Sequence, residues 1–344
     1  MSLQSRFSFG PWNIDEGSDP FGPPVRDVVD FARKIKYYRE LGFSGVQFHD
    51  DDAVPHLDGM TAEQISAKAA QVKEVLDGEG LEAEFVAPRL WFSETTIDGA
   101  YTSNDPKARQ YALERSRKAV DIARILDTRL IVLWLAREGT YIREAKDARK
   151  CIEYIVAAIN ALLRHDPEIR IAIEPKPNEP MDVAFVPTSG HAVAVAYMSE
   201  DPPRVGVNIE SAHAILAGLD PSDEMGFALA HEKLFTVHLN DQNGLKFDQD
   251  KAFGSVDLRR AFNQVRMLER NDYGMRGEYI GLDVKAMRTQ KAENAVQHLV
   301  NSRSTFLHLL DLVRSLDEEE VNRLIDARDY DTLDGLIVQH LLSS

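Results

Sequence analysis

The sequence is poor in several kinds of residue, and each scarcity excludes a class of protein. Its single cysteine, Cys151, cannot form a disulfide within the chain, which is typical of a reducing compartment. No window reaches the roughly 20 apolar residues of a membrane span, and the first ten residues hold no apolar stretch of signal-peptide length. We therefore expect a soluble, cytoplasmic protein.

Positive charge is also scarce. The chain carries 40 basic residues against 56 acidic ones, which gives a formal net charge of -16. A protein of this sign is repelled by the phosphate backbone of nucleic acids and by anionic lipid headgroups. We expect neither nucleic acid nor a membrane among its partners.

Strand-like segments alternate with amphipathic segments along most of the chain. Strands are expected at residues 7–10, 45–49, 82–87, 130–134, 169–174, 204–210, 234–240 and 278–283. Helical spacing of apolar residues is found at 28–38, from Thr61 onward, and at 106–126, 145–164, 188–199, 223–231, 257–270 and 290–315. Eight alternations predict a closed (β/α)8 TIM barrel. An open doubly wound sheet is the alternative, but no G-x-G-x-x-G turn follows the first strand.

The last residues do not continue this repeat. We expect a barrel domain over residues 1–315 and a C-terminal helical tail over 316–344, which opens with the acidic run 317–320. The apolar stripe of the tail is narrow. It could pack on its own barrel or on a neighbouring subunit, and spacing alone leaves both open.

Polar side chains stand at the carboxyl ends of five expected strands. In chain order they are His49 to Asp52, Glu174 with Lys176, Glu210 with His213, His238 followed by Asp248 and Asp250, and Asp283 with Lys285. Active sites of (β/α)8 barrels lie at these strand ends. Each group alone could be an ordinary surface or core residue. Together, carboxylates that converge on one pocket could not all stay ionised without cations.

The ligand types indicate which cations these would be. Many carboxylates with a few imidazoles favour Mg²⁺, Mn²⁺ or Co²⁺ over metals that prefer thiolates. The number of ligands fits two divalent metal ions. Trp12 and Trp134, which follow the first and fourth strands, could wall the pocket, although tryptophan at a strand end is also common core material.

The ordered motifs of the chain resemble those of the class I xylose isomerases, the compact actinobacterial type. The matching blocks are DPFG at 19–22, FHDDD at 48–52, REG at 137–139, IEPKPNEP at 173–180, GVN-x-E-x-x-H at 206–213, LN-x-QNG-x-K-x-DQD at 239–250, D-x-K at 283–285 and HLL at 340–342. The resemblance implies a divalent-metal-dependent aldose-ketose isomerase. Such an enzyme moves hydride between C1 and C2 of an open-chain sugar.

The resemblance also implies a role for each matching residue. The first metal ion would be held by Glu174, Glu210 and Asp283, and the second by Glu210, His213, Asp248 and Asp250. Lys176 would hydrogen-bond the C1 oxygen, and His49, oriented by Asp52, would assist ring opening as a proton carrier. The remaining contacts to the sugar would come from Trp12, Trp134 and the Phe21 of a neighbouring subunit, in a homotetramer built from dimers.

Three features depart from that family. His238 stands where the family has an aspartate, and an imidazole there removes one negative charge and favours Mn²⁺ or Co²⁺. Arg89 and Trp91 replace asparagine and phenylalanine at the sugar end, so the substrate could carry a carboxylate or phosphate, unless Arg89 simply pairs with a surplus acid. The tail is shorter, which leaves a homodimer as open as a tetramer.

Other functions remain alternatives at this point. A barrel epimerase or isomerase for another sugar would move a proton through an enediolate. A phosphodiesterase of the endonuclease type would need more histidines and a basic groove, which the net charge disfavours. A sugar-binding homologue without catalysis would bind its ligand but not convert it.

Overall fold

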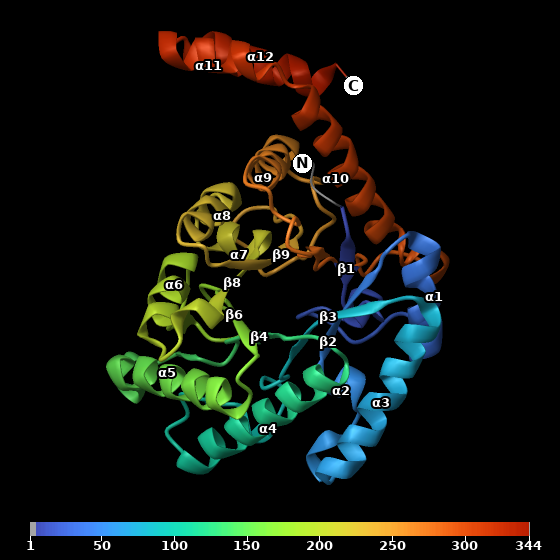
Figure 1. Ribbon diagram of the computed structural model, residues 1–344, viewed down its shortest axis with the longest axis vertical. Helices are drawn as coiled ribbons and strands as arrows, with labels where there is room; N and C mark the ends of the chain where they lie inside the picture. Colours follow the sequence, from blue (N-terminus) through green and yellow to red (C-terminus); the bar gives the residue numbers. More distant parts are fainter. Residues whose placement is uncertain (1–4, 344) are drawn as a thin grey trace.

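The computed structural model describes residues 5–343, and it contains the expected barrel. Residues 1–4 and 344, which fall in the expected N-terminal segment and tail, lie outside the described residues. Eight strands in the described part form one closed parallel sheet in the order β1-β10-β9-β8-β6-β4-β3-β2 (Figure 1). They are β1 (Phe7–Phe9), β2 (Gly45–His49), β3 (Glu82–Ala87), β4 (Leu130–Trp134), β6 (Arg170–Glu174), β8 (Val205–Glu210), β9 (Leu234–Leu239) and β10 (Ile280–Leu282). The (β/α)8 prediction is confirmed.

Helices cover the outside of this barrel (Figure 1). The larger ones are α1 (Phe31–Leu41), α3 (Ala62–Glu79), α4 (Pro106–Ile125), α5 (Ala148–His165), α6 (Ser189–Met198), α8 (Pro221–Ala230), α9 (Leu258–Arg270) and α10 (Gln297–Ser315). Two of the helix starts expected from the sequence were wrong. Asp30 caps α1 by accepting a hydrogen bond from the Arg33 backbone N–H, so the helix excludes Val28. The helix expected from residue 290 begins only at Gln297, after a separate 3-10 turn.

Short elements at the ends of the strands were not expected from the sequence. Helices α2 (Asp50–Ala53) and α7 (Ser211–Leu216) follow β2 and β8 without a loop. Strands β5 (Gly139–Thr140) and β7 (Val183–Ala184) form a separate antiparallel pair. They are too short to carry a sequence signal, yet they lie in the loops that follow β4 and β6.

Alternation along the strands decides which side chains reach the barrel interior. Ile171 and Ile173 of β6 belong to the large cluster shared with the helices, whereas Ala172 packs in a small inner cluster with Phe85 and Val132. Because neighbouring side chains on a strand point to opposite faces, Glu174 lies on the inner side with Ala172. By the same alternation, Asn208 and Glu210 of β8 share the inner face of the barrel, as do Thr236 and His238 of β9. The strand pattern thus delivers polar groups into the mouth of the barrel.

A buried ion pair fixes the end of β2. The guanidinium of Arg115 on α4 donates from Nε to Asp50 Oδ2 at 2.7 Å and from Nη2 to Asp50 Oδ1 at 2.9 Å. The Asp50 side chain is fully buried, and this burial raises its pKa although Arg115 opposes the rise. Asp50 Oδ1 also accepts the backbone N–H of Arg89 at 3.1 Å. One carboxylate therefore joins the ends of β2 and β3 to α4.

His298 fixes the loop that follows β1, the strand next to β2 in the barrel. His298, near the start of α10, contacts the backbone oxygen of Asn13 through Nε2 at 2.8 Å. Its imidazole is buried, and burial lowers the pKa of His298 to about 4. The neutral ring therefore donates its Nε2 proton to the loop that follows β1. That loop carries Asn13 and Trp12 into the mouth of the barrel.

The tail consists of α11 (Glu318–Ala327) and α12 (Tyr330–Leu342), which extend beyond α9 and α10 (Figure 1). It contacts its own chain: Glu318 pairs with Arg266 at 3.0 Å, and His340 Nε2 lies 2.7 Å from the Leu312 oxygen. Apolar surface remains exposed on it, including Ile325 and Leu342. The tail thus contacts the barrel domain of its own chain, and its role between subunits stays a prediction.

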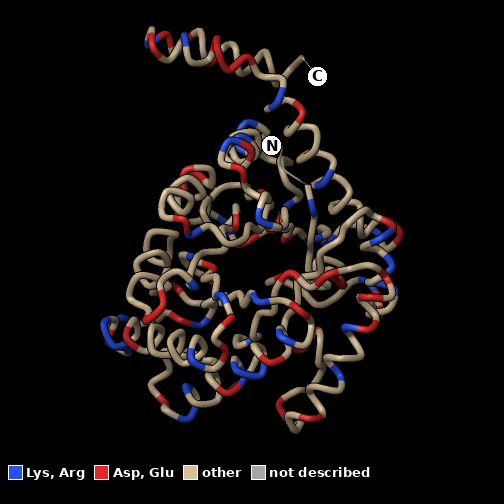
Figure 2. Tube along the Cα trace, viewed as in Figure 1, with Lys and Arg blue, Asp and Glu red and all other residues tan. Residues whose placement is uncertain are grey.

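Acidic and basic residues are interspersed along the outer helices in the Cα trace of Figure 2. None of the helices within residues 5–343 combines the length and the apolar character needed to cross a membrane.

We expect Arg115→Met to lower the free energy of unfolding by about 3–5 kcal/mol, because Asp50 would remain buried without its counter-charge. Urea denaturation followed by circular dichroism measures this. Arg124→Met, which removes an exposed arginine of the same helix, should cost less than about 0.5 kcal/mol. Equal losses in the two variants would contradict a special role for the buried pair.

We expect acid to destabilise the protein partly through His298. Its pKa is lower in the folded chain than the ordinary value of 6.5, so the unfolded chain binds a proton that the folded chain refuses. Stability is full above about pH 6.5 and falls by up to about 3 kcal/mol toward pH 4. His298→Gln should show a smaller loss than the wild type between pH 7.5 and 4, and the exposed His308→Gln should not. Parallel curves for all three would refute this.

Candidate active site

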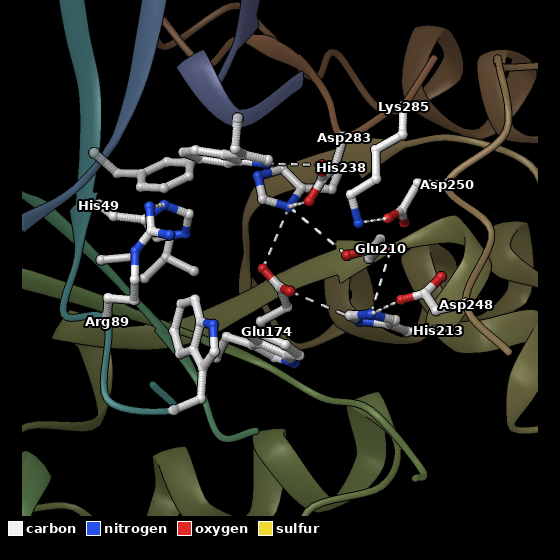
Figure 3. A pocket seen from close by; sticks show the side chains of 16 residues that line it. His49, Arg89, Glu174, Glu210, His213, His238, Asp248, Asp250, Asp283 and Lys285 are labelled. Atoms are coloured by element: carbon white, nitrogen blue, oxygen red, sulfur yellow. Dashed lines mark hydrogen bonds and ion pairs between the residues drawn. The ribbon is translucent and has the colours of Figure 1, made fainter. Parts of the chain in front are cut away.

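A cavity of about 240 Å³ opens at the carboxyl ends of the barrel strands. Its walls combine aromatic rings with charged groups, and they draw on all eight barrel strands or the loops that follow them (Figure 3). The lining residues are Trp12, His49, Phe85, Ala87, Arg89, Trp91, Val132, Trp134, Glu174, Glu210, His213, His238, Asp248, Asp250, Asp283 and Lys285. Of the residues that the sequence singled out as site candidates, all but Phe21, treated below, line this cavity or contact its charged groups. Asp52 contacts two lining residues, His49 and Arg89.

Glu210 lies at the centre of the charged groups. Three sets of side chains bring their ligand atoms within 4.8 Å of one another, and Glu210 belongs to all of them. The sets are Glu174 with Glu210 and His213, Glu210 with His238 and Asp283, and Glu210 with Asp248 and Asp250. The parallel register of β8 and β9 explains part of this, since Glu210 pairs with His238. Glu210 could therefore bridge two cations.

His238 lies among three carboxylates of the cluster. Its Nδ1 lies 3.3 Å from Glu174 Oε2, and 3.9 Å from both Glu210 Oε2 and Asp283 Oδ2. Burial alone would lower the pKa of His238, but the negative charge of Glu174 outweighs it and raises the pKa to about 9. In the absence of a metal ion, this imidazole acts as one of the site's counter-charges.

The carboxylates of the site cannot all be ionised. Burial and the neighbouring Asp248 and Asp250 raise the pKa of Glu210 well above its usual range. Burial and Asp248 raise the pKa of Asp250 to about 8. For Glu174, burial opposes ionisation, but His238 lowers the pKa to about 2. Part of the cluster therefore holds protons that a divalent cation would displace.

Buried polar atoms without a partner also indicate that the cluster can hold divalent cations. Four atoms in the cluster are buried without a hydrogen-bond partner: His213 Nδ1, Asp248 Oδ1 and both ring nitrogens of His238. Buried polar atoms are seldom left unpaired, so each marks a place for an absent partner. Oxygen and imidazole donors at this density suit Mg²⁺, Mn²⁺ or Co²⁺. The residues fit a divalent metal centre.

Two lysines stand beside the cluster. Lys176 is buried and donates to Asp248 Oδ2 at 2.8 Å, with Glu179 Oε2 at 3.4 Å. Burial opposes its charge, but Asp248 outweighs burial and raises the pKa of Lys176. Lys285 pairs with Asp250. Lys176 is therefore a fixed ammonium at the edge of the pocket.

Arg89 is paired within the protein. Its Nε lies 2.8 Å from Asp51 Oδ1 and its Nη2 lies 3.1 Å from Asp52 Oδ1. The second carboxylate also faces His49, whose Nδ1 is 3.0 Å from Asp52 Oδ2. Of the two roles that the sequence left open for Arg89, pairing with surplus acids is the one that the geometry favours.

Aromatic rings close the pocket around His49. The Trp12 and Trp91 ring centroids lie 4.1 Å and 5.2 Å from that of His49, and Trp91 meets Trp134 at 4.4 Å. The indole of Trp12 donates to Asp283 Oδ1 at 2.9 Å. Phe21 is different, because its side chain is 78% exposed and packs on Phe247 outside the cavity. It does not line the pocket of its own chain.

Comparison with known proteins agrees with this architecture. Residues 35–301 match the family model described as a xylose isomerase-like TIM barrel. The chain belongs to the xylose isomerase-like TIM barrel family. A xylose isomerase of Thermus thermophilus is 34% identical over 330 residues, which span 94% of this chain and 84% of that protein. The actinobacterial branch is not singled out by these matches.

Solved structures with the same barrel are more distant. A D-tagatose 3-epimerase-like protein matches 89% of this chain and 98% of its own, with a TM-score of 0.64 and 14% identity. A 3-keto-D-glucoside 4-epimerase from E. coli matches 89% of this chain and 99% of its own, with a TM-score of 0.61 and 14% identity. At this identity the likeness establishes the fold alone.

Several residues that shape this xylose isomerase-like site were not predicted. Asn240 donates from Nδ2 to Glu210 Oε1 at 2.9 Å, and its Oδ1 accepts the backbone N–H of Ala212 at 2.7 Å. Asn208 donates to Glu174 Oε2 at 2.6 Å. Asn208 lies within β8 and Asn240 directly follows β9, both within the motifs noted above and two residues from a candidate ligand. That position was the available signal.

We expect His238→Asp to move the metal preference of this family member toward Mg²⁺. The change adds a negative charge and an oxygen ligand in place of a nitrogen. Calorimetric titration of metal-free protein should show the ratio of Mn²⁺ to Mg²⁺ affinity falling by roughly tenfold or more. His308→Asp adds the same charge on exposed α10 and should leave the ratio unchanged. An unaltered ratio in His238→Asp would mean that His238 is not a ligand.

Proposed function

We propose that this protein is a divalent-metal-dependent aldose-ketose isomerase that moves hydride between C1 and C2 of an open-chain sugar. The observation that carries the proposal is the position of Glu210, which is shared by three potential ligand sets beside the ammonium of Lys176. Two metal ions at Glu174, Glu210, His213, His238, Asp248, Asp250 and Asp283 would fit that arrangement. When bound, they would supply Lewis-acid polarisation of sugar oxygens.

The residues of the chain would do the remaining work. Lys176, held by Asp248, would donate a hydrogen bond to the C1 oxygen and oppose negative charge that develops there. His49, which lies next to Asp52, would hydrogen-bond the sugar and act as a proton carrier during ring opening. The rings of Trp12, Trp91 and Trp134 would exclude water from the transferred hydrogen.

The substrate is proposed to be a small neutral aldose such as xylose. The cavity of about 240 Å³ is smaller than the roughly 300–1,000 Å³ typical of sites for drug-sized ligands. Arg89 has two carboxylate partners already, so an acidic sugar would have to compete with Asp51 and Asp52. The 34% identical relative named xylose isomerase supports the same substrate class. The motifs further support the compact class I type.

We also propose that the enzyme is a cytoplasmic homo-oligomer, either a homodimer or a homotetramer. The exposed Phe21 and the apolar surface of α11 and α12 support an interface between copies. In such an assembly Phe21 of one subunit would reach the pocket of another. Light scattering on the purified protein measures the mass.

We expect the metal-loaded enzyme to convert xylose to its ketose in D₂O without incorporating deuterium at C1. A hydride that passes directly between C1 and C2 does not exchange with solvent, and proton NMR of the product measures this. Deuterium at C1 would indicate an enediolate and would favour the epimerase-type alternative. Binding of metal and sugar without turnover would indicate a sugar-binding homologue.

Variants at two lysines test the proposed site within the same assay. Lys176→Met should lower kcat by roughly 10²-fold or more, because it removes the donor at the reacting oxygen. Lys246→Met alters an exposed lysine in the loop that carries Asp248 and should retain activity. Similar activity in both variants would place the reaction elsewhere.

A further inference from the structure

Two groups of opposite character face the same nitrogen of His49. Asp52 Oδ2 lies 3.0 Å from His49 Nδ1, and Arg89 Nη2 lies 2.6 Å from it. A neutral imidazole nitrogen either carries a proton and donates, or is bare and accepts. A carboxylate requires the first state, whereas a guanidinium, which has no acceptor, requires the second. Both contacts cannot be hydrogen bonds at once.

The surroundings favour the contact with Arg89. Its Nη2 donates a hydrogen bond to Asp52 Oδ1 at 3.1 Å, and its Nε forms an ion pair with Asp51 Oδ1 at 2.8 Å without a hydrogen bond. Carboxylates on two sides therefore hold the guanidinium beside the imidazole. Asp52 Oδ2 does not depend on the ring, because it also accepts the His49 backbone N–H at 3.1 Å. Losing the ring proton would cost Asp52 little, whereas a bare Nδ1 gives Arg89 a charge-assisted bond.

We propose that Arg89 is a positioning residue that fixes His49 as the tautomer with the proton on Nε2. The ring lies between Trp12 and Trp91 and lines the cavity, and its Nε2 has no hydrogen-bond partner among residues 5–343 (Figure 3). The proton of His49 therefore faces the cavity. The imidazole presents a donor there, although the contact with Asp52 alone would make it an acceptor.

The proton on Nε2 also affects which atom of a bound sugar can face His49, an inference that rests on the proposed function. A protonated Nε2 donates a hydrogen bond, so it favours a sugar oxygen that accepts one, such as the ring oxygen of a closed sugar. It disfavours a hydroxyl group oriented to donate its own proton to Nε2. His49 would enter ring opening as the group that gives a hydrogen bond rather than the group that removes a proton. The resembling family has asparagine at the position of Arg89, so this control of the tautomer belongs to this chain.

Solid-state ¹⁵N NMR of protein with labelled histidine rings tests the assignment directly. The protein is loaded with Mg²⁺, kept free of sugar and measured at pH 8, and the His49 signals are identified as those missing from His49→Gln. We expect a bare Nδ1 and a protonated Nε2. A protonated Nδ1 in the wild type would overturn the proposal, whatever the enzyme's activity, so this outcome is separate from a failure of the isomerase assignment.

Two variants extend the test. Arg89→Met leaves Asp52 as the partner of Nδ1, and the proton should shift from Nε2 to Nδ1. Arg137→Met is the matched control, because Arg137 lies beside the same loop, with its Nε 3.3 Å from the Trp91 oxygen, and does not contact His49. The control should keep the wild-type tautomer. An unchanged tautomer in folded Arg89→Met would refute the role of Arg89, and if that variant does not fold, the wild-type spectrum decides.

Discussion

The structure of the site depends on one constraint: the carboxylate of Glu210 is buried among other carboxylates. Burial and four acidic neighbours raise its pKa, and its side chain is almost inaccessible to solvent. Ionisation therefore needs counter-charge or hydrogen-bond donors close by. The chain supplies Asn240, His238, Lys176 and Lys285 around it, and the remaining deficit of positive charge is the physical argument for divalent cations.

The barrel makes this crowding tolerable by fixing each group from a different element. Glu174, Glu210 and His238 come from three adjacent strands of a closed sheet, so none can withdraw without breaking strand pairing. The loops are secured separately, by Asp50 with Arg115 and by His298 on the backbone of Asn13. Repulsion within the site is thus balanced by packing and ion pairs outside it, as is common where polar groups are preorganised for function.

Sequence patterns located the strands and the candidate ligands for a shared reason. Alternation such as Ile169, Ile171 and Ile173 reveals the strand, and the strand end locates Glu174 because a barrel brings all carboxyl ends together. The partners of Arg89 and the exposure of Phe21 were not predictable in this way. They depend on distances between loops whose conformation no periodicity encodes, and on a 37-residue separation between Arg89 and Asp52. Asn240 was missed because its hydrogen bonds are local to the folded site.

Two of the departures of this chain from the class I pattern act on the same property. His238 places an imidazole where an aspartate is expected, and Arg89 places a guanidinium against His49. Each bears on where a proton resides, since His238 shares positive charge with Glu174 and Arg89, as proposed above, occupies Nδ1 of His49. Because proton location sets both metal preference and the polarity of hydrogen bonds to a sugar, divergence within this fold can proceed without moving the ligands. A pocket of unchanged shape can in this way bind a different metal and favour a different form of its substrate.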